Sequence, residues 1–385
     1  MWEKIGNFAW FSRLCESCKP KPCKLLLKNM RETKKAILRL EDGTIFEGKS
    51  FGFEKACAGE VVFNTAMTGY PESLTDPSYE GQILVSTFPL IGNYGVPPKG
   101  EKSNMARFFE SERIHCEAII CQDYSWDYSH WLAERSLSDW LKEEKIVGVY
   151  GIDTRALTKQ LREKGSMLGR ISIEGCADVE NYDPNKENLV GKVSCKEIIE
   201  YGEGEKTVVL VDCGTKNNIV RCLANRGVKV VRVPWDYDFS QINYDGLFIS
   251  NGPGDPDMAD KTVENIRKAL SGDKPICGIC MGNQLLAKAA GAKTYKLKYG
   301  HRSHNQPVRQ EGTNRCFITS QNHGFAVDNS TLPSDWEPLF INMNDGTNEG
   351  IRHKTKPFFS AQFHPEACSG PLDTEFIFDD FIKLL

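Results

Sequence analysis

The sequence has no long apolar run and no large excess of charge of either sign. No stretch of eighteen or more consecutive apolar residues occurs in its 385 residues, so we expect no membrane-spanning helix. Lys and Arg number 48 against 52 Asp and Glu, a net charge of −4, which argues against non-specific nucleic-acid binding. We therefore expect neither a membrane nor a nucleic acid among the partners of this chain.

Two further signals are missing. No secretory apolar segment precedes the first domain, and the first half has no glycine loop of the kind that binds nucleotides. Without a secretory segment, we expect the 14 cysteines to lie in a reducing compartment, where structural disulfides are rare. Histidine is scarce, with seven residues, and a lone histidine is usually a satisfied surface or core residue.

Residues 1–35 form a basic leader, with nine Lys and Arg against three Glu. Mitochondrial targeting segments are basic and amphipathic, so we expect a mitochondrial location, with the cytoplasm as the alternative. Cys15, Cys18 and Cys23 invite a zinc interpretation, but no fourth ligand follows at a matching spacing. We therefore expect no metal site in the chain.

The length exceeds one ordinary hydrophobic core and predicts two domains in an α/β protein. We expect a mixed α/β domain over 36–199, opened by a hairpin whose strands, 36–40 and 45–48, flank an Asp-Gly turn. Residues 68–79 are dense in turn formers, which predicts a polar loop. The remaining pattern predicts strands at 60–65, 82–88, 118–121 and 146–152 and helices at 138–144 and 154–164.

The pattern changes after a glycine-containing charged stretch, 200–206, which we interpret as a linker. From 207 to 385 apolar strands alternate with helices, which predicts a second domain with a mostly parallel sheet. The site of such a sheet lies at the carboxyl ends of its strands. The expected strands there include 208–212, 228–233, 246–250, 276–279, 316–320 and 358–363, and the expected helices include 216–226 and 285–290.

Cys280 follows one of these strands and is flanked by glycines on both sides. A strand, a sharp turn and a helix present a side chain at a helix N-terminus, where N–H groups and the helix dipole favour a thiolate. We therefore expect Cys280 to be an exposed nucleophile on a tight turn. The alternative is a small buried core residue, which is what most intracellular cysteines are.

His364 and Glu366 are the candidate partners of this thiol. They end another expected strand, where His364 can accept the thiol proton and Glu366 can orient the imidazole. Residues 251–256, rich in glycine, follow a neighbouring strand and can bring backbone N–H groups close to a ligand. The constellation predicts nucleophilic catalysis at one edge of the sheet.

These motifs, with those of the first half, resemble two known families. Residues 278–284, 321–325 and 363–366 are similar, in order and spacing, to the class I (triad) glutamine amidotransferase domain. The first half resembles the N-terminal domain of the carbamoyl-phosphate synthetase small subunit, and residues 184–186 and 233–235 look like its animal type. The first-half motifs lie at 40–44, 59–65, 68–72, 74–79, 89–95 and 151–155.

The resemblance assigns roles to particular positions. It implies a triad of Cys280, His364 and Glu366 and an oxyanion hole from the N–H groups of Gly252 and Met281. Many relatives have Leu-Gly-His-Gln after the cysteine, whereas Met281 and Asn283 replace Leu and His here. The positions that the family uses to bind glutamine fall on Ser78, Gly252, Gly254, Met281, Gln284, Asn322, Gly324 and Phe325.

The implied reaction is glutamine hydrolysis through a Cys280 thioester. The ammonia would pass through an internal tunnel to a synthetase large subunit or domain that makes carbamoyl phosphate from bicarbonate and ATP. No ATP-binding region is recognisable, so we expect no cofactor in this chain and assign ATP and Mg²⁺ to the partner. The same chemistry would serve arginine, pyrimidine or urea synthesis.

Two other interpretations remain open at this point. Some animal relatives have lost the cysteine and use free ammonia, so the domain can be a catalytically silent structural or allosteric subunit. The retained Cys280 argues for glutamine use instead. The other of these two interpretations is an amidotransferase that serves another synthase, such as one making anthranilate or GMP. The motifs of the first half argue against it.

Overall fold

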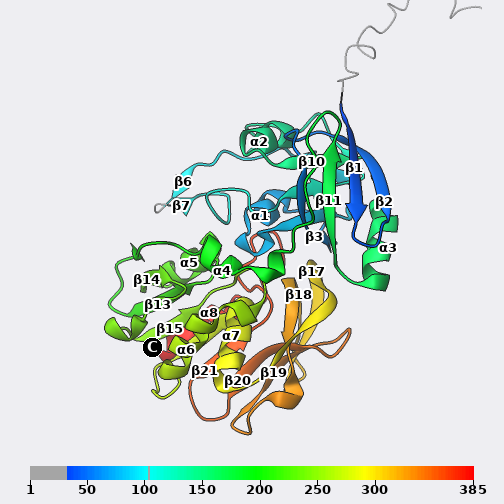
Figure 1. The fold of residues 1–385 in the computed structure, drawn as a ribbon. Coiled ribbons are helices and arrows are strands. Elements are labelled where there is room, and N and C mark those ends of the chain that lie inside the picture. Colours follow the sequence, from blue (N-terminus) through cyan, green and yellow to red (C-terminus); the bar gives the residue numbers. More distant parts are fainter. Residues whose placement is uncertain (1–32, 103–104) are drawn as a thin grey trace, which may run out of the picture. The chain divides into compact units, whose positions relative to one another are not determined.

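The computed structural model describes residues 33–102 and 105–385, and Lys35–Leu385 form one compact unit (Figure 1). Residues 1–32 of the expected targeting segment, with the cysteines of the zinc interpretation, lie outside the described residues, and Lys35 already belongs to the first strand. No helix in the described part of the chain combines the length and the apolar character needed to cross a membrane.

The first half is built on a closed barrel, with strand order β1-β11-β3-β4-β8-β10-β2 in the described residues. The predicted hairpin is confirmed, because β1 and β2 pair antiparallel with Leu38 opposite Phe46. Neighbours β3, β4, β8 and β10 run parallel. The barrel strands are β1 (Lys35–Leu40), β2 (Ile45–Ser50), β3 (Cys57–Asn64), β4 (Gln82–Ser86), β8 (Ala118–Ile120), β10 (Val147–Tyr150) and β11 (Met167–Ile173).

Two helices pack on this barrel at the positions that local signals predict. Helix α2 (Leu137–Glu143) begins after Ser136, whose Oγ accepts from the Asp139 N–H. Helix α3 (Thr154–Lys164) begins after Asp153, which accepts from the Ala156 N–H, and ends at Gly165. The smaller elements of this half are β5 (Leu90–Ile91), β6 (Glu101–Lys102), β7 (Met105–Ala106), β9 (Asp123–Tyr124), α4 (Leu189–Val193) and the short 3-10 helix η2 (Pro184–Lys186).

The expectation of a polar loop at 68–79 was wrong. Helix α1 (Tyr70–Thr75) and the 3-10 helix η1 (Pro77–Tyr79) occupy this stretch. Pro71 stands in the first helical turn, where its missing N–H has no cost, and the Asp76 side chain caps η1. Burial of Tyr70, Leu74 and Tyr79 stabilises these helices, although the composition of the stretch favours turns.

The second half contains a ten-stranded sheet in the order β12-β14-β13-β15-β16-β21-β20-β19-β17-β18, counted over the described residues. Strands β14, β13, β15, β16 and β21 are parallel, as predicted. The strands are β12 (Ile199–Tyr201), β13 (Thr207–Asp212), β14 (Lys229–Pro234), β15 (Gly246–Ile249), β16 (Ile276–Ile279), β17 (Thr294–Gln310), β18 (Cys316–Val327), β19 (Trp336–Asn342), β20 (Asn348–His353) and β21 (Phe358–Ala361).

Helices cover both faces of this sheet. Alternate residues of one strand enter opposite core clusters: Val209 packs with helices α6 and α7, and Val208 with α5 and α8. Both faces are therefore dry, which explains the uninterrupted apolar strands of the sequence. The helices are α5 (Asn217–Ala224), α6 (Asp260–Ala269), α7 (Met281–Ala290) and α8 (Phe376–Leu384), with 3-10 helices η3 (Phe239–Gln241), η4 (Pro256–Met258) and η5 (Asn329–Thr331).

Two expected boundaries differ from the structure. The linker interpretation of 200–206 was wrong at its start, because Glu200 and Tyr201 belong to edge strand β12, which pairs antiparallel with β14. Residues 321–325 do not follow a strand that ends at 320, since β18 continues through them to Val327. Pairing with the long strand β17 extends β18 past the polar residues that suggested its end.

Candidate active site

Cys280 lies at the junction of β16 and α7, on the tight turn that the flanking glycines predict. Its backbone has φ 54° and ψ −103°, a conformation that costs a non-glycine residue strain energy. The Cys280 N–H donates to the Ala361 carbonyl of β21 at 2.8 Å, which ties the turn to the next strand. The side chain is 2% exposed, so the expectation of an exposed thiol was wrong.

The two glycines beside the turn leave no room for a side chain. A Cβ on Gly278 would lie 2.5 Å from the Gly282 carbonyl oxygen, and one on Gly282 would lie 2.2 Å from the Ile249 oxygen. Both distances are far below van der Waals contact. The glycines therefore allow close packing of strand, turn and helix, which holds Cys280 in its strained conformation.

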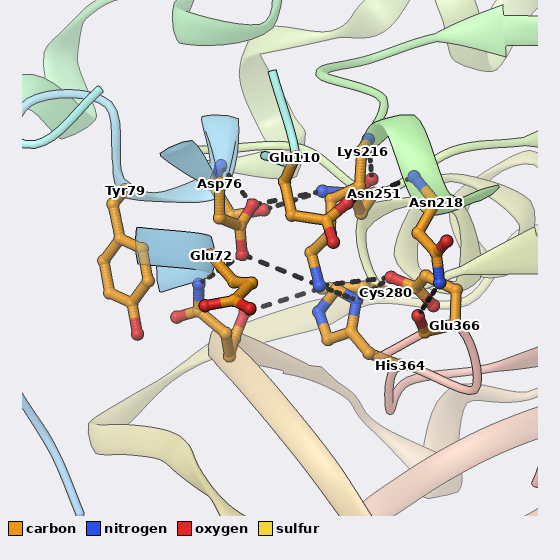
Figure 2. Close-up of polar contacts among 12 residues, drawn as sticks. Glu72, Asp76, Tyr79, Glu110, Lys216, Asn218, Asn251, Cys280, His364 and Glu366 are labelled. Atoms are coloured by element: carbon orange, nitrogen blue, oxygen red, sulfur yellow. Dashed lines mark hydrogen bonds and ion pairs between the residues drawn. The ribbon is translucent and has the colours of Figure 1, made fainter. Parts of the chain in front are cut away.

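His364 and Glu366 follow β21, the parallel neighbour of β16, and Figure 2 shows their side chains beside Lys216. His364 Nδ1 lies 2.7 Å from Glu366 Oε1, and both side chains are buried. The other ring nitrogen, Nε2, makes no hydrogen bond to the described residues, but the imidazole interacts electrostatically with Cys280. The structure thus brings the three predicted triad residues together.

Lys216 is the main feature of this site that sequence reasoning missed. Its Nζ lies 3.1 Å from Glu366 Oε1, 3.1 Å from His364 Nδ1 and 3.7 Å from Asp76 Oδ2 (Figure 2). Burial lowers the pKa of Lys216, but Glu366 and Asp76 outweigh burial and raise it. The only signal available was its place just after β13, at the carboxyl edge of the parallel strands.

Lys216 and Glu366 act in opposite directions on the imidazole. Burial lowers the pKa of His364 and Lys216 lowers it further, yet Glu366 and Cys280 outweigh both and raise it to about 10. Burial raises the pKa of Glu366, but Lys216 and His364 hold it at about 2. At neutral pH the site therefore holds an ionised Glu366 and a protonated His364.

Every residue to which the resemblance assigns glutamine binding lines a single cavity, together with Cys280. Within it, Gln284 Nε2 donates to the Phe325 carbonyl at 2.9 Å and to Gln362 Oε1 at 3.2 Å. The predicted residues that meet at this cavity are Ser78, Gly252, Gly254, Cys280, Met281, Gln284, Asn322, Gly324 and Phe325.

One carboxylate, Asp76, joins the first half of the chain to the cavity. Asp76 Oδ1 accepts from the Ser78 N–H at 2.9 Å, and Oδ2 accepts from Asn322 Nδ2 at 3.2 Å. Asn251 Nδ2 donates to Ser78 Oγ at 3.0 Å. The segment that sequence analysis took for a loop therefore contributes Ser78 to the wall of the cavity that Cys280 lines.

Asn283, which departs from the common amidotransferase pattern, points into the core rather than into the cavity. It is fully buried, and its Nδ2 donates to Gln362 Oε1 at 2.9 Å while its Oδ1 accepts from Ser360 Oγ at 2.7 Å. Ser360 and Gln362 lie on and just after β21, which leads to His364. Asn283 thus connects the nucleophile helix to the strand that carries the base.

Charged side chains that were not predicted also line the cavity. Lys296 Nζ lies 2.6 Å from Glu60 Oε1 of the first half. Arg302 is buried, and its Nε makes no hydrogen bond to the residues that the structure describes. Burial lowers the pKa of this guanidinium, against the opposing influence of Glu60. These groups give the cavity a polar, positively charged side.

Comparison with known families agrees with the two-part architecture. The model for "Carbamoyl-phosphate synthase small chain, CPSase domain" matches residues 38–171, and that for "Glutamine amidotransferase class-I" matches residues 209–384. The chain belongs to the carbamoyl-phosphate synthase small-chain family. The nucleophile turn, the triad and the cavity described above lie mainly in its amidotransferase domain, and Ser78 and Asp76 come from its small-chain domain.

Curated relatives of this family carry the same region inside much longer proteins. Multifunctional protein pyr1-3 of Dictyostelium discoideum is 55% identical over 373 residues, covering 91% of this chain and 17% of the relative. Carbamoyl-phosphate synthase [ammonia], mitochondrial, of Homo sapiens is 51% identical over 355 residues, covering 91% of this chain and 24% of the relative. The chain therefore spans a quarter or less of the length of these relatives.

Proposed function

We propose that this chain is the glutaminase component of a glutamine-hydrolysing carbamoyl-phosphate synthase. The observation that carries the proposal is the strained, buried Cys280 beside the His364–Glu366 pair, at the floor of a polar cavity. A structural subunit would have no need to keep a non-glycine residue at positive φ next to a protonated imidazole. The match of residues 38–171 to the small-chain domain supports this synthase over one making another product.

The reaction begins when the Cys280 thiolate attacks the side-chain carbonyl carbon of glutamine. A C–S bond forms, and the carbonyl electrons move to oxygen as the tetrahedral intermediate appears. The Met281 N–H, in the first turn of α7, and the Gly252 N–H are the donors for this oxyanion. Removing one such donor typically costs about a hundredfold or more in rate.

His364 then gives its Nε2 proton to the amide nitrogen, and the C–N bond breaks to release ammonia. The γ-glutamyl thioester remains on Cys280. His364, now neutral, takes a proton from water as the hydroxyl attacks the thioester, and glutamate leaves with regeneration of the thiolate–imidazolium pair. Glu366 keeps the Nδ1 proton of His364 in place throughout, at 2.7 Å.

A second cavity offers a route for the ammonia. It shares Lys216, Asn322 and His364 with the surroundings of the triad. Its other walls include Glu72 and Glu110, whose pKa values are raised by burial. Polar groups in a confined space can accept hydrogen bonds from ammonia and keep it from bulk water.

The proposed partner is a synthetase large subunit or domain that uses the ammonia with bicarbonate and ATP. This chain itself would need no cofactor, and ATP and Mg²⁺ would act on the partner. The relatives named above, in which this region is part of a longer chain, support a partner domain fused to it, and a separate subunit is the alternative. The product would serve pyrimidine, arginine or urea synthesis.

We place this activity in mitochondria, because of the basic residues in 1–35 and the mitochondrial name of the human relative. The Dictyostelium relative carries no such name, and the cytoplasm is the alternative. A fluorescent protein fused behind residues 1–35 should enter mitochondria. A diffuse cytoplasmic signal would contradict the assignment.

The proposal is tested by measuring glutamate released from glutamine, with and without a synthetase large chain. The wild-type chain should hydrolyse glutamine, the large chain should raise the rate, and Cys280→Ala should abolish it. Cys316→Ala, at an exposed cysteine, is the matched control and should retain the wild-type rate. A wild-type chain as inactive as Cys280→Ala, even with the partner, would leave the silent subunit as the function.

A further inference from the structure

A second cluster of titratable side chains lies beneath the strands that carry the glutamine-binding residues. His301 on β17 is paired across the sheet with His323 on β18, and Glu349 on β20 lies beside them. All three are buried, and one possible ligand atom from each lies within 4.8 Å of the other two. None of them takes part in the proposed glutaminase mechanism.

The outer contacts of the two histidines each use one ring nitrogen. His301 Nε2 lies 2.8 Å from Asp345 Oδ2, and His323 Nδ1 donates to the Phe325 carbonyl at 2.8 Å. Metal-binding histidines characteristically use their second nitrogen in this way, on a carboxylate or a carbonyl. With the single ring proton on His301 Nε2 and on His323 Nδ1, the other nitrogens, His301 Nδ1 and His323 Nε2, carry lone pairs.

Two atoms of the cluster make no hydrogen bond to the described residues. They are His301 Nδ1 and Glu349 Oε2, whereas Glu349 Oε1 accepts from Asn342 Nδ2 at 2.8 Å. Buried polar atoms are almost always paired, because an unpaired one loses its hydrogen bonds to water without replacement. An acceptor nitrogen and a carboxylate oxygen left without donors both favour a cation.

The contact of His323 with Gln321 points the same way. Gln321 Nε2 donates to Thr319 Oγ1 at 3.1 Å, so Gln321 Oε1 is directed towards His323 Nε2, 3.1 Å away. With the His323 proton on Nδ1, two lone pairs face each other. A bound cation would turn this repulsion into coordination and would make Gln321 a candidate fourth ligand.

We propose that His301, His323 and Glu349 bind a divalent transition-metal ion. Two imidazoles and a carboxylate are a ligand set that suits zinc, and the buried position is that of a structural ion. Tetrahedral zinc with bonds of about 2.1 Å needs ligand atoms about 3.4 Å apart, so the side chains would close by roughly an ångström. Such an ion would fix β18, which carries Asn322 and Gly324 on either side of His323.

Sequence analysis gave no sign of this site, because its ligands come from three strands and show no regular spacing. His301 and Glu349 lie 8% and 0% exposed, so an ion there would be shielded from solvent. The competing explanation is metal-free: His301 as an imidazolium between Asp345 and Glu349, 3.4 Å from Glu349 Oε1. The two explanations differ in whether cobalt or zinc binds.

The test is titration of the chelator-treated full chain with Co²⁺ and with Zn²⁺. The background carries Cys15→Ser, Cys18→Ser and Cys23→Ser, so that leader thiols do not compete. We expect one equivalent to bind, with visible Co²⁺ bands lacking thiolate charge transfer, and zinc to raise Tm by several degrees. His301→Asn and Glu349→Gln should each weaken binding at least tenfold, whereas His130→Gln, at a half-buried histidine outside the cluster, should not.

The absence of stoichiometric binding by the folded background chain would overturn the proposal in favour of the imidazolium. Binding that survives in both His301→Asn and Glu349→Gln would place the ion elsewhere and would overturn it equally. Far-UV circular dichroism checks that each variant folds, and the titration of the background chain decides the question if a variant does not.

Discussion

At the scale of single residues, Lys216 sets the balance of charge at the triad. Its positive charge lowers the pKa values of both His364 and Glu366. Replacing it by methionine leaves the imidazolium opposed only by burial, so neutral His364 would form at higher pH. A less acidic imidazolium gives its proton to the leaving nitrogen less readily, so we expect Lys216→Met to lower glutamine hydrolysis about tenfold or more at neutral pH.

The pH profile separates this role from a merely structural one. The alkaline limb of the rate profile, where His364 loses its proton, should move to higher pH in Lys216→Met, because the pKa of His364 rises when the lysine charge is lost. Lys216→Arg keeps the charge and should keep the wild-type limb. A uniform loss of rate with an unmoved profile would contradict the electrostatic role.

The strain at Cys280 predicts that relieving it raises the stability of the protein at the expense of its activity. A glycine adopts φ 54° without the cost that a side chain carries, so Cys280→Gly should abolish hydrolysis yet raise the free energy of unfolding by about 1 kcal/mol. Cys280→Ala keeps a Cβ and is the matched control, with no such gain. Urea unfolding of the two variants measures the difference, and equal midpoints would show that the turn is not strained.

Sequence alone found the residues whose chemistry depends on local pattern. The turn around Cys280 and the strand-end pair of His364 and Glu366 follow from short motifs. Lys216 and Asp76 were missed because their roles depend on which distant segments pack beside them. A lysine after a strand looks like any solvated lysine until the sheet brings Glu366 to within 3.1 Å.

At the scale of secondary-structure elements, Asn283 couples helix α7 to strand β21. Asn283→Leu is similar in volume but removes both hydrogen bonds, so that Gln362 Oε1 keeps only Gln284 as a donor and Ser360 Oγ keeps only its longer contacts with Ile351. We expect a loss of about 1–3 kcal/mol in the free energy of unfolding. Thermal or urea unfolding measures it, and Lys288→Gln on the same helix controls for effects of helix composition.

The size of the stability loss in Asn283→Leu distinguishes two outcomes. A loss below about 0.5 kcal/mol for Asn283→Leu would show that the apolar core absorbs the substitution. The hydrolysis rate should fall as well, because β21 leads directly to His364. A stable and fully active variant would contradict the coupling.

Elements with strong local signals were predicted closely, and those shaped by long-range packing were not. Helix α3 carries a capping aspartate at one end and a glycine at the other, and it was placed correctly at 154–164. Helix α1 lacks such a cap, since its N-cap Gly69 provides no side chain. Its stability comes from burial against the barrel, which local sequence does not report.

At the scale of the whole molecule, Glu80 connects the barrel to helix α4. This buried carboxylate is 2.7 Å from His115 Nδ1, 2.9 Å from Arg113 Nη2 and 2.8 Å from Lys192 Nζ. Lys192 lies on α4, whose Val190 belongs to the core of the second sheet. The ion pairs therefore connect the barrel to a segment packed on the other half.

Glu80 predicts a specific acid sensitivity. Burial raises the pKa of its carboxyl, but His115 and Lys192 outweigh burial and lower the pKa to about 2. A depressed pKa in the folded state stabilises the protein above the unfolded value of about 4.3, and this stabilisation is lost as pH falls towards 2. Glu80→Gln should cost about 1–3 kcal/mol at pH 7 and flatten the decline between pH 4.5 and 2.

Urea unfolding across this pH range checks the prediction, with Glu47→Gln, at an exposed ion pair with Lys35, as the control. The control should change stability by less than about 1 kcal/mol at any pH. A Glu80→Gln curve parallel to the wild-type curve would assign the acid sensitivity to other carboxylates.

The global architecture was predictable in its second half and only partly in its first. Apolar strands that alternate with helices leave little choice but a parallel sheet, and the sheet determines where Cys280 and His364 meet. Closure of the barrel depends on the pairing of β1 with β11 and of β2 with β10, which are far apart in the chain. No local pattern encodes those pairings.

Asp76 gives the molecule a mechanical link that a single-domain amidotransferase would lack. It contacts Ser78 and Asn322, which line the cavity, and Lys216, which sets the charge at the triad. One side chain of the first half therefore holds all three residues in place. A small displacement of η1 would open the cavity and pull Asp76 away from Lys216. Because Lys216 acts on His364, the same movement would change the pKa of the imidazole. A force applied to the barrel would therefore lower the reactivity of Cys280 without any direct contact with its side chain.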